Sequence, residues 1–376
     1  MSTVELCEPN LVTREDTLKE LCGKLISEKQ IAVDTESNSL FAYREQVCLI
    51  QFSTPEEDFI IDPLVISDLS PLSPIFSNPT IEKIFHACEY DLICLKRDFG
   101  FTFSNIFDTF TAARILGREA VGLGAILESE FSIQVNKRYQ RANWGQRPLP
   151  RHLLAYAQID THYLISVRDR FAAELEQKGL MPLAREDFIR LCQVNNHNYD
   201  EKTDDCWRIN GASDLTPQKA AVLNELCRLR DRIAKRINQP LFKVYNDRIL
   251  LELAKECPRS MEEIQTLGLL NSRQIKQDGE AIVAAINKGL AAPPLHPNRS
   301  HRPSDQFLSR LENLRKWRKS AALKMQVSSD VVLPRDLLFQ IAETNPGNIQ
   351  ELQGIMKNVP WRMQQFGDQI INAIHG

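Results

Sequence analysis

The chain has 376 residues and a formal net charge of −3, which excludes a globally basic, histone-like binder of nucleic acid but leaves room for local basic patches. Its nine cysteines include no CxxC pair, so the sequence predicts no zinc knuckle and no disulfide framework. This cysteine usage indicates a reduced, cytoplasmic protein. The N-terminus lacks the pattern of a signal sequence, and no apolar run approaches the roughly 18 residues of a membrane span.

The first half of the chain alternates between strand and helix signals. Apolar, β-branched stretches predict four strands, over residues 31–35, 47–53, 59–62 and 83–86. Amphipathic stretches predict four helices, over residues 90–97, 109–116, 123–131 and 150–178. Because the strands come first and most helices follow, we expect an α/β domain with a mixed sheet that helices cover on both faces.

From about residue 215 the chain reads as helix only, and it repeats itself. Eleven residues recur without gaps at an offset of 88, from the pair Leu226 and Leu314 to the pair Ile286 and Ile374. Helical periodicity alone does not readily reproduce so many positions, so we predict two copies of one small helical domain. The predicted boundaries are 1–200 for the α/β domain, 211–290 and 305–376 for the two helical copies, and 291–304 for a proline-rich linker.

Acidic residues recur where this fold could bring them to one point. Asp34 and Glu36 are two apart on a strand, whose period of two places both carboxylates on one face. Tyr156 and Asp160 are four apart in the last helix and share a face of it. Asp91 lies at the start of the helix that follows the fourth strand, where an acid also offsets the helix dipole.

Four converging carboxylates require cations, because uncompensated like charges at close range raise pKa values and destabilise the fold. A pair of hard divalent cations is the natural occupant, and such pairs serve phosphodiester cleavage. Each fragment alone also has an ordinary structural interpretation, as solvated acids at a strand end or helix start and as a half-buried tyrosine. The combination is what favours a metal site.

Together these motifs resemble the DEDD superfamily of 3′–5′ exonucleases, in its tyrosine branch, and within it the ribonuclease D family. The flanking stretches VCLIQFS, FDTFTAARIL and NWGQRPLPRHLLAYAQID strengthen the resemblance. Ala155 stands where the histidine branch would have its histidine. Ala142 and Asn143 replace the serine–aspartate pair that usually precedes Trp144, a departure that touches no catalytic position.

The resemblance implies a ribonuclease H-like exonuclease domain followed by two all-α domains of the HRDC type. It implies that Asp34, Glu36 and Asp160 hold one divalent cation, Mg²⁺ or Mn²⁺, and that Asp34 and Asp91 hold a second. Tyr156 would aim the attacking water. The implied reaction is hydrolysis of RNA from a free 3′ end to nucleoside 5′-monophosphates by a monomeric enzyme, with precursor tRNA as the expected substrate.

In chain order, Asp34 and Glu36 form the first motif, Asp91 the second, and Tyr156 with Asp160 the third. Basic residues before the third motif indicate where RNA would lie. No acid occurs between Gln134 and Ile159, a stretch that contains five basic residues: Lys137, Arg138, Arg141, Arg147 and Arg151. These side chains are candidates for contacts to phosphates, although a solvated basic loop would look the same. Leu40 and Phe41, which follow the first motif, could stack on the terminal base or could belong to the core.

Two alternatives stay open from the sequence. A DNA exonuclease of the same superfamily would use the same carboxylates, since the discrimination of RNA from DNA depends on groups that sense the 2′-hydroxyl. A non-catalytic nucleic-acid-binding module would not need all four acids and Tyr156, which are intact. A helicase fragment is disfavoured because no GxxxxGK[ST] phosphate-binding loop occurs.

Overall fold

The computed structural model describes residues 6–135, 137–193, 206–296 and 303–375. Its contacts divide the chain into two compact units: Met1–Ser37, Val47–Asn196 and Pro303–Gly376 form the first, and Asn38–Gln46 with His197–Arg302 form the second. The middle of the predicted linker lies outside the described residues. Among the described residues, no helix is long and apolar enough to cross a membrane.

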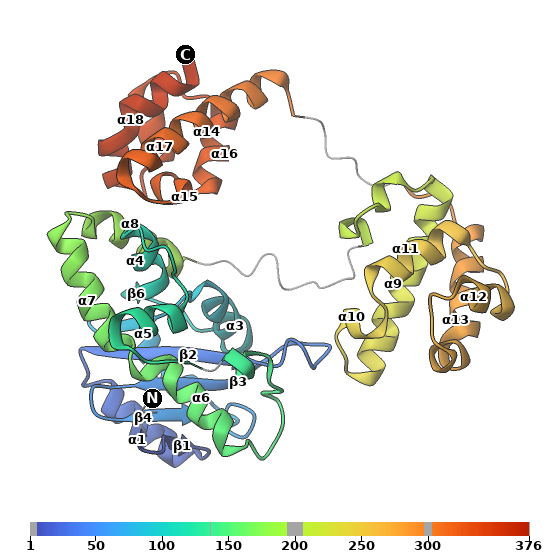
Figure 1. Cartoon of the computed structure of the whole chain (residues 1–376), viewed down its shortest axis with the longest axis horizontal. Coiled ribbons are helices and arrows are strands. Elements are labelled where there is room, and N and C mark those ends of the chain that lie inside the picture. The colour runs from blue at the N-terminus through green and yellow to red at the C-terminus, as the bar shows by residue number, and fades with distance from the viewer. Residues whose placement is uncertain (1–5, 136, 194–205, 297–302, 376) are drawn as a thin grey trace. The chain divides into compact units, whose positions relative to one another are not determined.

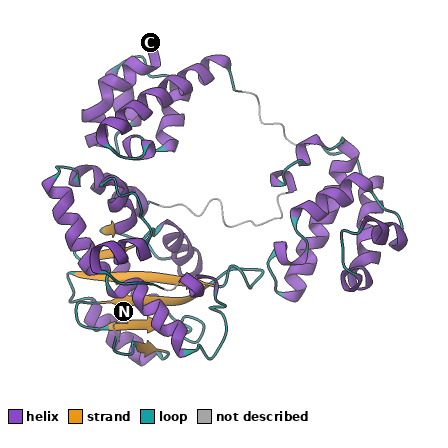
Figure 2. Ribbon diagram, viewed as in Figure 1, coloured by secondary structure: helices purple, strands orange, loops and turns teal. Residues whose placement is uncertain are grey.

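A six-stranded mixed sheet forms the centre of the first unit, and all the strands of the described chain belong to it (Figures 1 and 2). The strands are β1 (Asn10–Val12), β2 (Gln30–Ser37), β3 (Val47–Ser53), β4 (Asp58–Ile61), β5 (Glu82–Phe85) and β6 (Ile106–Asp108). They lie in the order β1-β4-β3-β2-β5-β6. The central strand β2 is antiparallel to β3 and parallel to β5, which confirms the predicted mixed sheet.

Helices cover both faces of this sheet. They are α1 (Glu15–Leu25), α2 (Ser73–Ser77), α3 (Glu89–Phe99), α4 (Thr109–Ile115), α5 (Leu123–Phe131), α6 (Arg151–His162), α7 (Leu164–Gln177) and α8 (Met181–Cys192), with short 3-10 turns η1 (Ser70–Leu72) and η2 (Lys137–Arg141). Adjacent residues of β2 belong to different cores: Val33 packs with Leu21 of α1, whereas Ala32 packs with Val167 of α7. The alternation of the strand therefore builds two apolar layers.

Two details of the first unit differ from the sequence expectations. The single helix predicted over 150–178 is two helices, and Tyr163 ends the first and begins the second. This break lets α6 pack on β2, β3 and β4 while α7 packs on β2 and β5. Strands β1 and β6 were not predicted, since three residues are too few to show an alternating pattern.

The predicted helical repeat is present with the same offset of 88. The first copy consists of α9 (Pro217–Ile237), α10 (Leu241–Val244), α11 (Asp247–Glu256), α12 (Met261–Leu267) and α13 (Ser272–Ala291), and the second of α14 (Asp305–Met325), α15 (Ser329–Val332), α16 (Arg335–Thr344), α17 (Ile349–Ile355) and α18 (Pro360–His375). Internal contacts repeat as well. Arg230 donates to the carbonyl oxygen of Tyr245 at 3.0 Å, and the equivalent Arg318 donates to that of Leu333 at 3.0 Å.

The second copy packs against the α/β domain within the first unit. Arg362, at the start of α18, is completely buried, and its guanidinium contacts Glu186 at 2.9 Å and Asp187 at 2.8 Å, both on α8. Val331 of α15 joins the apolar core that α7 and α8 share. Two partly exposed ion pairs accompany this contact: Arg114 with Asp330, and Arg190 with Asp336. A buried ion pair thus anchors the second copy.

The sulfur atoms of Cys206 and Cys227 lie in contact in the second unit, a pairing that the cysteine spacing did not predict. Cys206 lies in the 3-10 turn η4 (Cys206–Arg208), which packs on the helix α9 that carries Cys227, and both side chains are buried. The two cysteines are 21 residues apart and form no recognisable motif. Their proximity results from tertiary packing, which the cysteine spacing does not reveal.

We expect the change of Arg362 to methionine to destabilise the first unit by about 3–5 kcal/mol, because Glu186 would keep a buried charge without its cation. Changing Glu186 to glutamine in the same protein removes that charge, so the double variant should recover most of the loss. Urea denaturation, monitored by circular dichroism, measures the free energy of unfolding of the single and the double variant. A double variant as unstable as the single one would show that the ion pair is not the anchor.

Candidate active site

Three predicted acids converge at the end of β2. Asp34, Glu36 and Asp160 each offer a carboxylate oxygen, and these oxygens lie within 4.8 Å of one another. β5 stops pairing with β2 at Ala32, so the two acids of β2 extend beyond it, while α6 brings Asp160 over the same strand. The period of two in the strand and the packing of α6 thus place the first and third motifs together.

Asp91 approaches the cluster from the first turn of α3, outside the group within 4.8 Å. The hydroxyl of Thr35, between the two acids of β2, donates a hydrogen bond to its carboxylate. The turn before α3 is held by Asp108, whose carboxylate accepts from the backbone N–H of Cys88 at 2.9 Å. Sequence reasoning did not identify Thr35 or Asp108, because both contacts depend on the spatial neighbourhood of β2, α3 and α4.

Burial of the four acids sets their electrostatics. It raises the pKa of Asp34 well above its usual value, with further increases from Asp91, Asp160 and Glu36. Burial likewise raises the pKa of Glu36 well above normal and the pKa values of Asp91 and Asp160 to about 7. Buried anions this close together are unfavourable unless a cation neutralises them. A set of carboxylate oxygens alone suits a hard divalent cation, so the residues fit a metal centre.

Tyr156 lies beside Asp160 in a largely buried position. Its side chain is 6% exposed, and its ring packs at 6.2 Å from that of Trp144 and 5.9 Å from that of Tyr139. Burial and the neighbouring carboxylates raise its pKa far above neutrality, so the hydroxyl keeps its proton. The hydroxyl hydrogen-bonds Asp160 and offsets part of the increase that burial causes in the pKa of that acid. It is therefore a fixed donor at the edge of the cluster.

Arg147 hydrogen-bonds groups of the protein itself, and its predicted contact with phosphate stays a prediction. Its Nε and Nη2 bind the buried carboxylate of Asp62 at 2.6 and 2.7 Å. Its remaining donors bind the carbonyl oxygens of Cys48, Trp144 and Gln146 at 2.7–2.9 Å. All five N–H donors are therefore engaged within the protein, and the guanidinium fastens the loop before α6 to β3 and β4.

The other predicted RNA contacts lie on the surface or outside the described side chains. Arg138, Arg141 and Arg151 are exposed, and the side chain of Lys137 is not among those the structure describes. In the second unit, Leu40 is 37% exposed, and Phe41 is partly buried with the ammonium of Lys243 at 4.2 Å from its ring centre. These contacts stay predictions.

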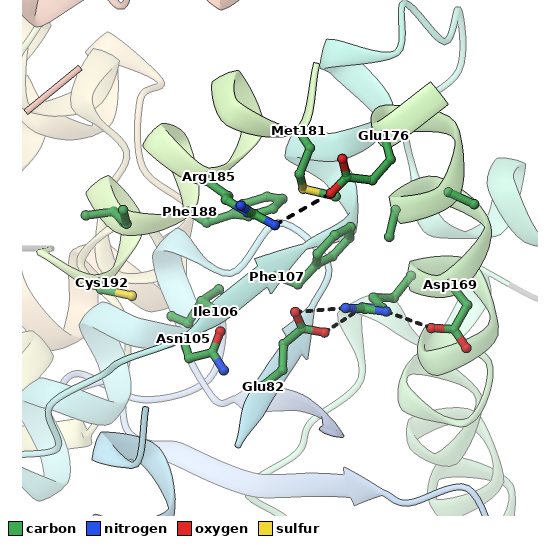
Figure 3. A pocket seen from close by; sticks show the side chains of 14 residues that line it. Glu82, Asn105, Ile106, Phe107, Asp169, Glu176, Met181, Arg185, Phe188 and Cys192 are labelled. Atoms are coloured by element: carbon green, nitrogen blue, oxygen red, sulfur yellow. Dashed lines mark hydrogen bonds and ion pairs between the residues drawn. The ribbon is translucent and has the colours of Figure 1, made fainter. Parts of the chain in front are cut away.

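A separate cavity of about 540 Å³ lies between β6, α7 and α8, and none of the predicted site residues lines it. Figure 3 shows its apolar floor, with Phe107 and Phe188, and the charged side chains around it. The cations pair with acids: Arg168 with Glu82, and Arg185 with Glu176. Because its charges neutralise one another, the cavity offers no clear ligand chemistry, and we assign it no function.

Known proteins match both parts of the chain. Residues 9–204 match the family model described as 3′–5′ exonuclease, and residues 219–286 and 307–374 each match the HRDC domain. The chain therefore belongs to the 3′–5′ exonuclease family. Its organisation, one exonuclease domain followed by two HRDC domains, is that of ribonuclease D, which confirms the resemblance and the fold class inferred from the sequence.

Relatives match this chain over most or nearly all of its length. Ribonuclease D of Nitrobacter hamburgensis is 27% identical over 98% of this chain and 95% of its own length. The crystal structure of Escherichia coli RNase D has a TM-score of 0.72 and 25% identity, over 98% of this chain and 99% of that one. Protein RRP6-like 2 of Arabidopsis thaliana is 30% identical over 88% of this chain, but the chain spans only 41% of that longer protein.

We expect divalent cations to stabilise the protein strongly above about pH 7 and only weakly near pH 5. The folded pKa values of Asp91 and Asp160 are raised to about 7, so between about pH 4 and 7 the folded state binds protons that the unfolded state releases. Metal-free stability therefore falls as the pH rises through this window. Melting temperatures with EDTA and with Mn²⁺ test this, and a cation effect independent of pH would contradict it.

Proposed function

We propose that the chain is a metal-dependent 3′–5′ exoribonuclease that releases nucleoside 5′-monophosphates from the 3′ end of RNA. The observation that carries this proposal is the partly buried group of three carboxylates within 4.8 Å, with a protonated tyrosine hydroxyl beside it. A non-catalytic binding module has no use for such a group, because the buried acids destabilise the fold when they ionise. The membership in the exonuclease family supports the same conclusion.

The residues divide into those that hold cations and those that orient reactants. Asp34, Glu36 and Asp160 would hold one cation, and Asp34 with Asp91 would hold the second. When bound, the two cations stabilise negative charge on the scissile phosphate and the departing oxygen. The Tyr156 hydroxyl, which hydrogen-bonds Asp160 in the metal-free protein, would turn to the attacking water and orient it once Asp160 binds a cation. Glu36 would meet the terminal 3′-hydroxyl and so confine hydrolysis to chain ends.

We propose structured RNA with a 3′ trailer, particularly precursor tRNA, as the substrate. Support comes from the Escherichia coli relative, which is described as an exoribonuclease involved in structured RNA processing. The exposed Arg138, Arg141 and Arg151 would contact phosphates on the approach to the site, and Leu40 and Phe41 would stack on the terminal base. We further propose that the enzyme acts as a monomer in the cytoplasm.

An end-labelled degradation assay on RNA and DNA oligomers of the same sequence tests the activity. We expect mononucleotides from RNA in Mg²⁺ or Mn²⁺ and none after chelation. Efficient digestion of DNA would instead favour the DNA exonuclease, because the carboxylates do not read the sugar. No hydrolysis with either cation would favour a binding module.

Replacing Asp34 by alanine should abolish turnover while the protein stays folded, since this residue is shared by both proposed cations. Tyr156→Phe should lower kcat by about 10²–10³-fold, as expected for the loss of one positioned hydrogen-bond donor. Single-turnover hydrolysis of labelled RNA measures both effects. Glu57→Ala, which removes an exposed acid paired with Lys24, is the control and should leave turnover unchanged. Near-normal hydrolysis by the Asp34 variant would contradict the proposed mechanism.

A further inference from the structure

Gln51, in the middle of β3, is a buried amide without a hydrogen-bond partner among the described residues. Its side chain is completely buried, and neither Oε1 nor Nε2 has a partner. Buried polar groups are almost always paired, and leaving one unpaired costs about 1–3 kcal/mol. A leucine of similar volume would avoid this cost. The presence of a glutamine at this position therefore has a reason other than the stability of the core.

The strand register places Gln51 beside the acids of β2. In the antiparallel pair of β2 and β3, Gln51 lies opposite Asp34, and Leu49 lies opposite Glu36. These four side chains therefore share one face of the sheet. Residues directly opposite each other in such a pair have Cβ atoms about 4.5–5.5 Å apart, which is within reach of a glutamine side chain.

The neighbours of Gln51 on β3 show that α6 covers this face. Leu49 belongs to one apolar cluster with Ala157 of α6, and the hydroxyl of Ser53 lies 2.7 Å from that of Thr161. Gln51 is between Leu49 and Ser53 on the same face. Its amide is therefore directed toward the stretch of α6 between Ala157 and Thr161, which carries the acid of the third motif.

We propose that Gln51 is a positioning residue of the metal centre, whose amide hydrogen-bonds a water molecule held between Asp34 and Asp160 when a divalent cation is bound. A carboxamide suits this place because Nε2 donates to an oxygen while Oε1 accepts from the water. A glutamate would add another negative charge to the cluster. The inference rests on the proposed metal-dependent function and extends it to a residue outside the four acids and Tyr156.

Replacing Gln51 by leucine separates a metal-linked role from a structural one. We expect the metal-free variant to melt at the same temperature as the wild type or higher, because an unpaired amide has been removed. Its affinity for Mn²⁺, measured by calorimetric titration, should fall about 10–100-fold, as is typical when a hydrogen-bond partner of the metal ligands is lost. Gln51→Met, an unbranched replacement, provides the same test if leucine does not pack.

Ser53→Ala is the matched control, on the same strand and face but with a hydroxyl that is paired to Asp58 and Thr161. We expect it to lower the metal-free melting temperature and to leave Mn²⁺ affinity unchanged. Normal Mn²⁺ affinity in both Gln51 variants would overturn the inference, and so would a metal-free loss of stability in both variants like that of Ser53→Ala. A wild type that binds no cation and hydrolyses no RNA would instead overturn the proposed function itself.

Discussion

The gathering of partly buried acids at the end of β2 is the constraint on which the arrangement of the first unit depends. β2 runs past the end of β5 and leaves Asp34 and Glu36 without a neighbouring strand on that side. α3 and α6 then bring Asp91 and Asp160 from two other directions. Burial at this place raises the pKa values of the acids and of Tyr156, and neighbouring carboxylates raise them further. The gathered acids lower the stability of the fold at this place, as is common where a functional site requires unfavourable contacts.

Periodicity accounts for what the sequence could predict. The spacing of two on a strand and of four on a helix placed Asp34 with Glu36 and Tyr156 with Asp160, and the fixed offset of 88 identified the duplicated helical domain. Each of these signals is local or repeats at constant distance. Asp91 offered no such signal beyond its place at a helix start, because its position depends on how α3 meets the sheet.

Tertiary partners account for what the sequence could not predict. Arg147 reads as one more basic residue before α6, yet Asp62, 85 positions earlier in the chain, occupies its guanidinium. Tyr163 interrupts an apolar pattern that continues on both sides of it. Gln51 lies in a strand that is buried at every position. In the sequence it is only one polar residue among apolar ones, and its importance is seen from its pairing with Asp34. In each case the informative neighbour is distant in sequence.

The similarity of the two helical copies raises the question of how the chain avoids docking the wrong copy on the exonuclease domain. Two domains with the same backbone could compete for one docking position on the exonuclease domain, and multidomain chains are prone to such misassembly. At the positions that anchor the second copy, the first copy has different residues: Lys243 for Val331, Arg248 for Asp336 and Gln274 for Arg362. The wrong copy would bury a lysine, oppose Arg190 with an arginine and leave Glu186 without a cation. The differences at these positions therefore favour docking of the second copy over the first at this surface.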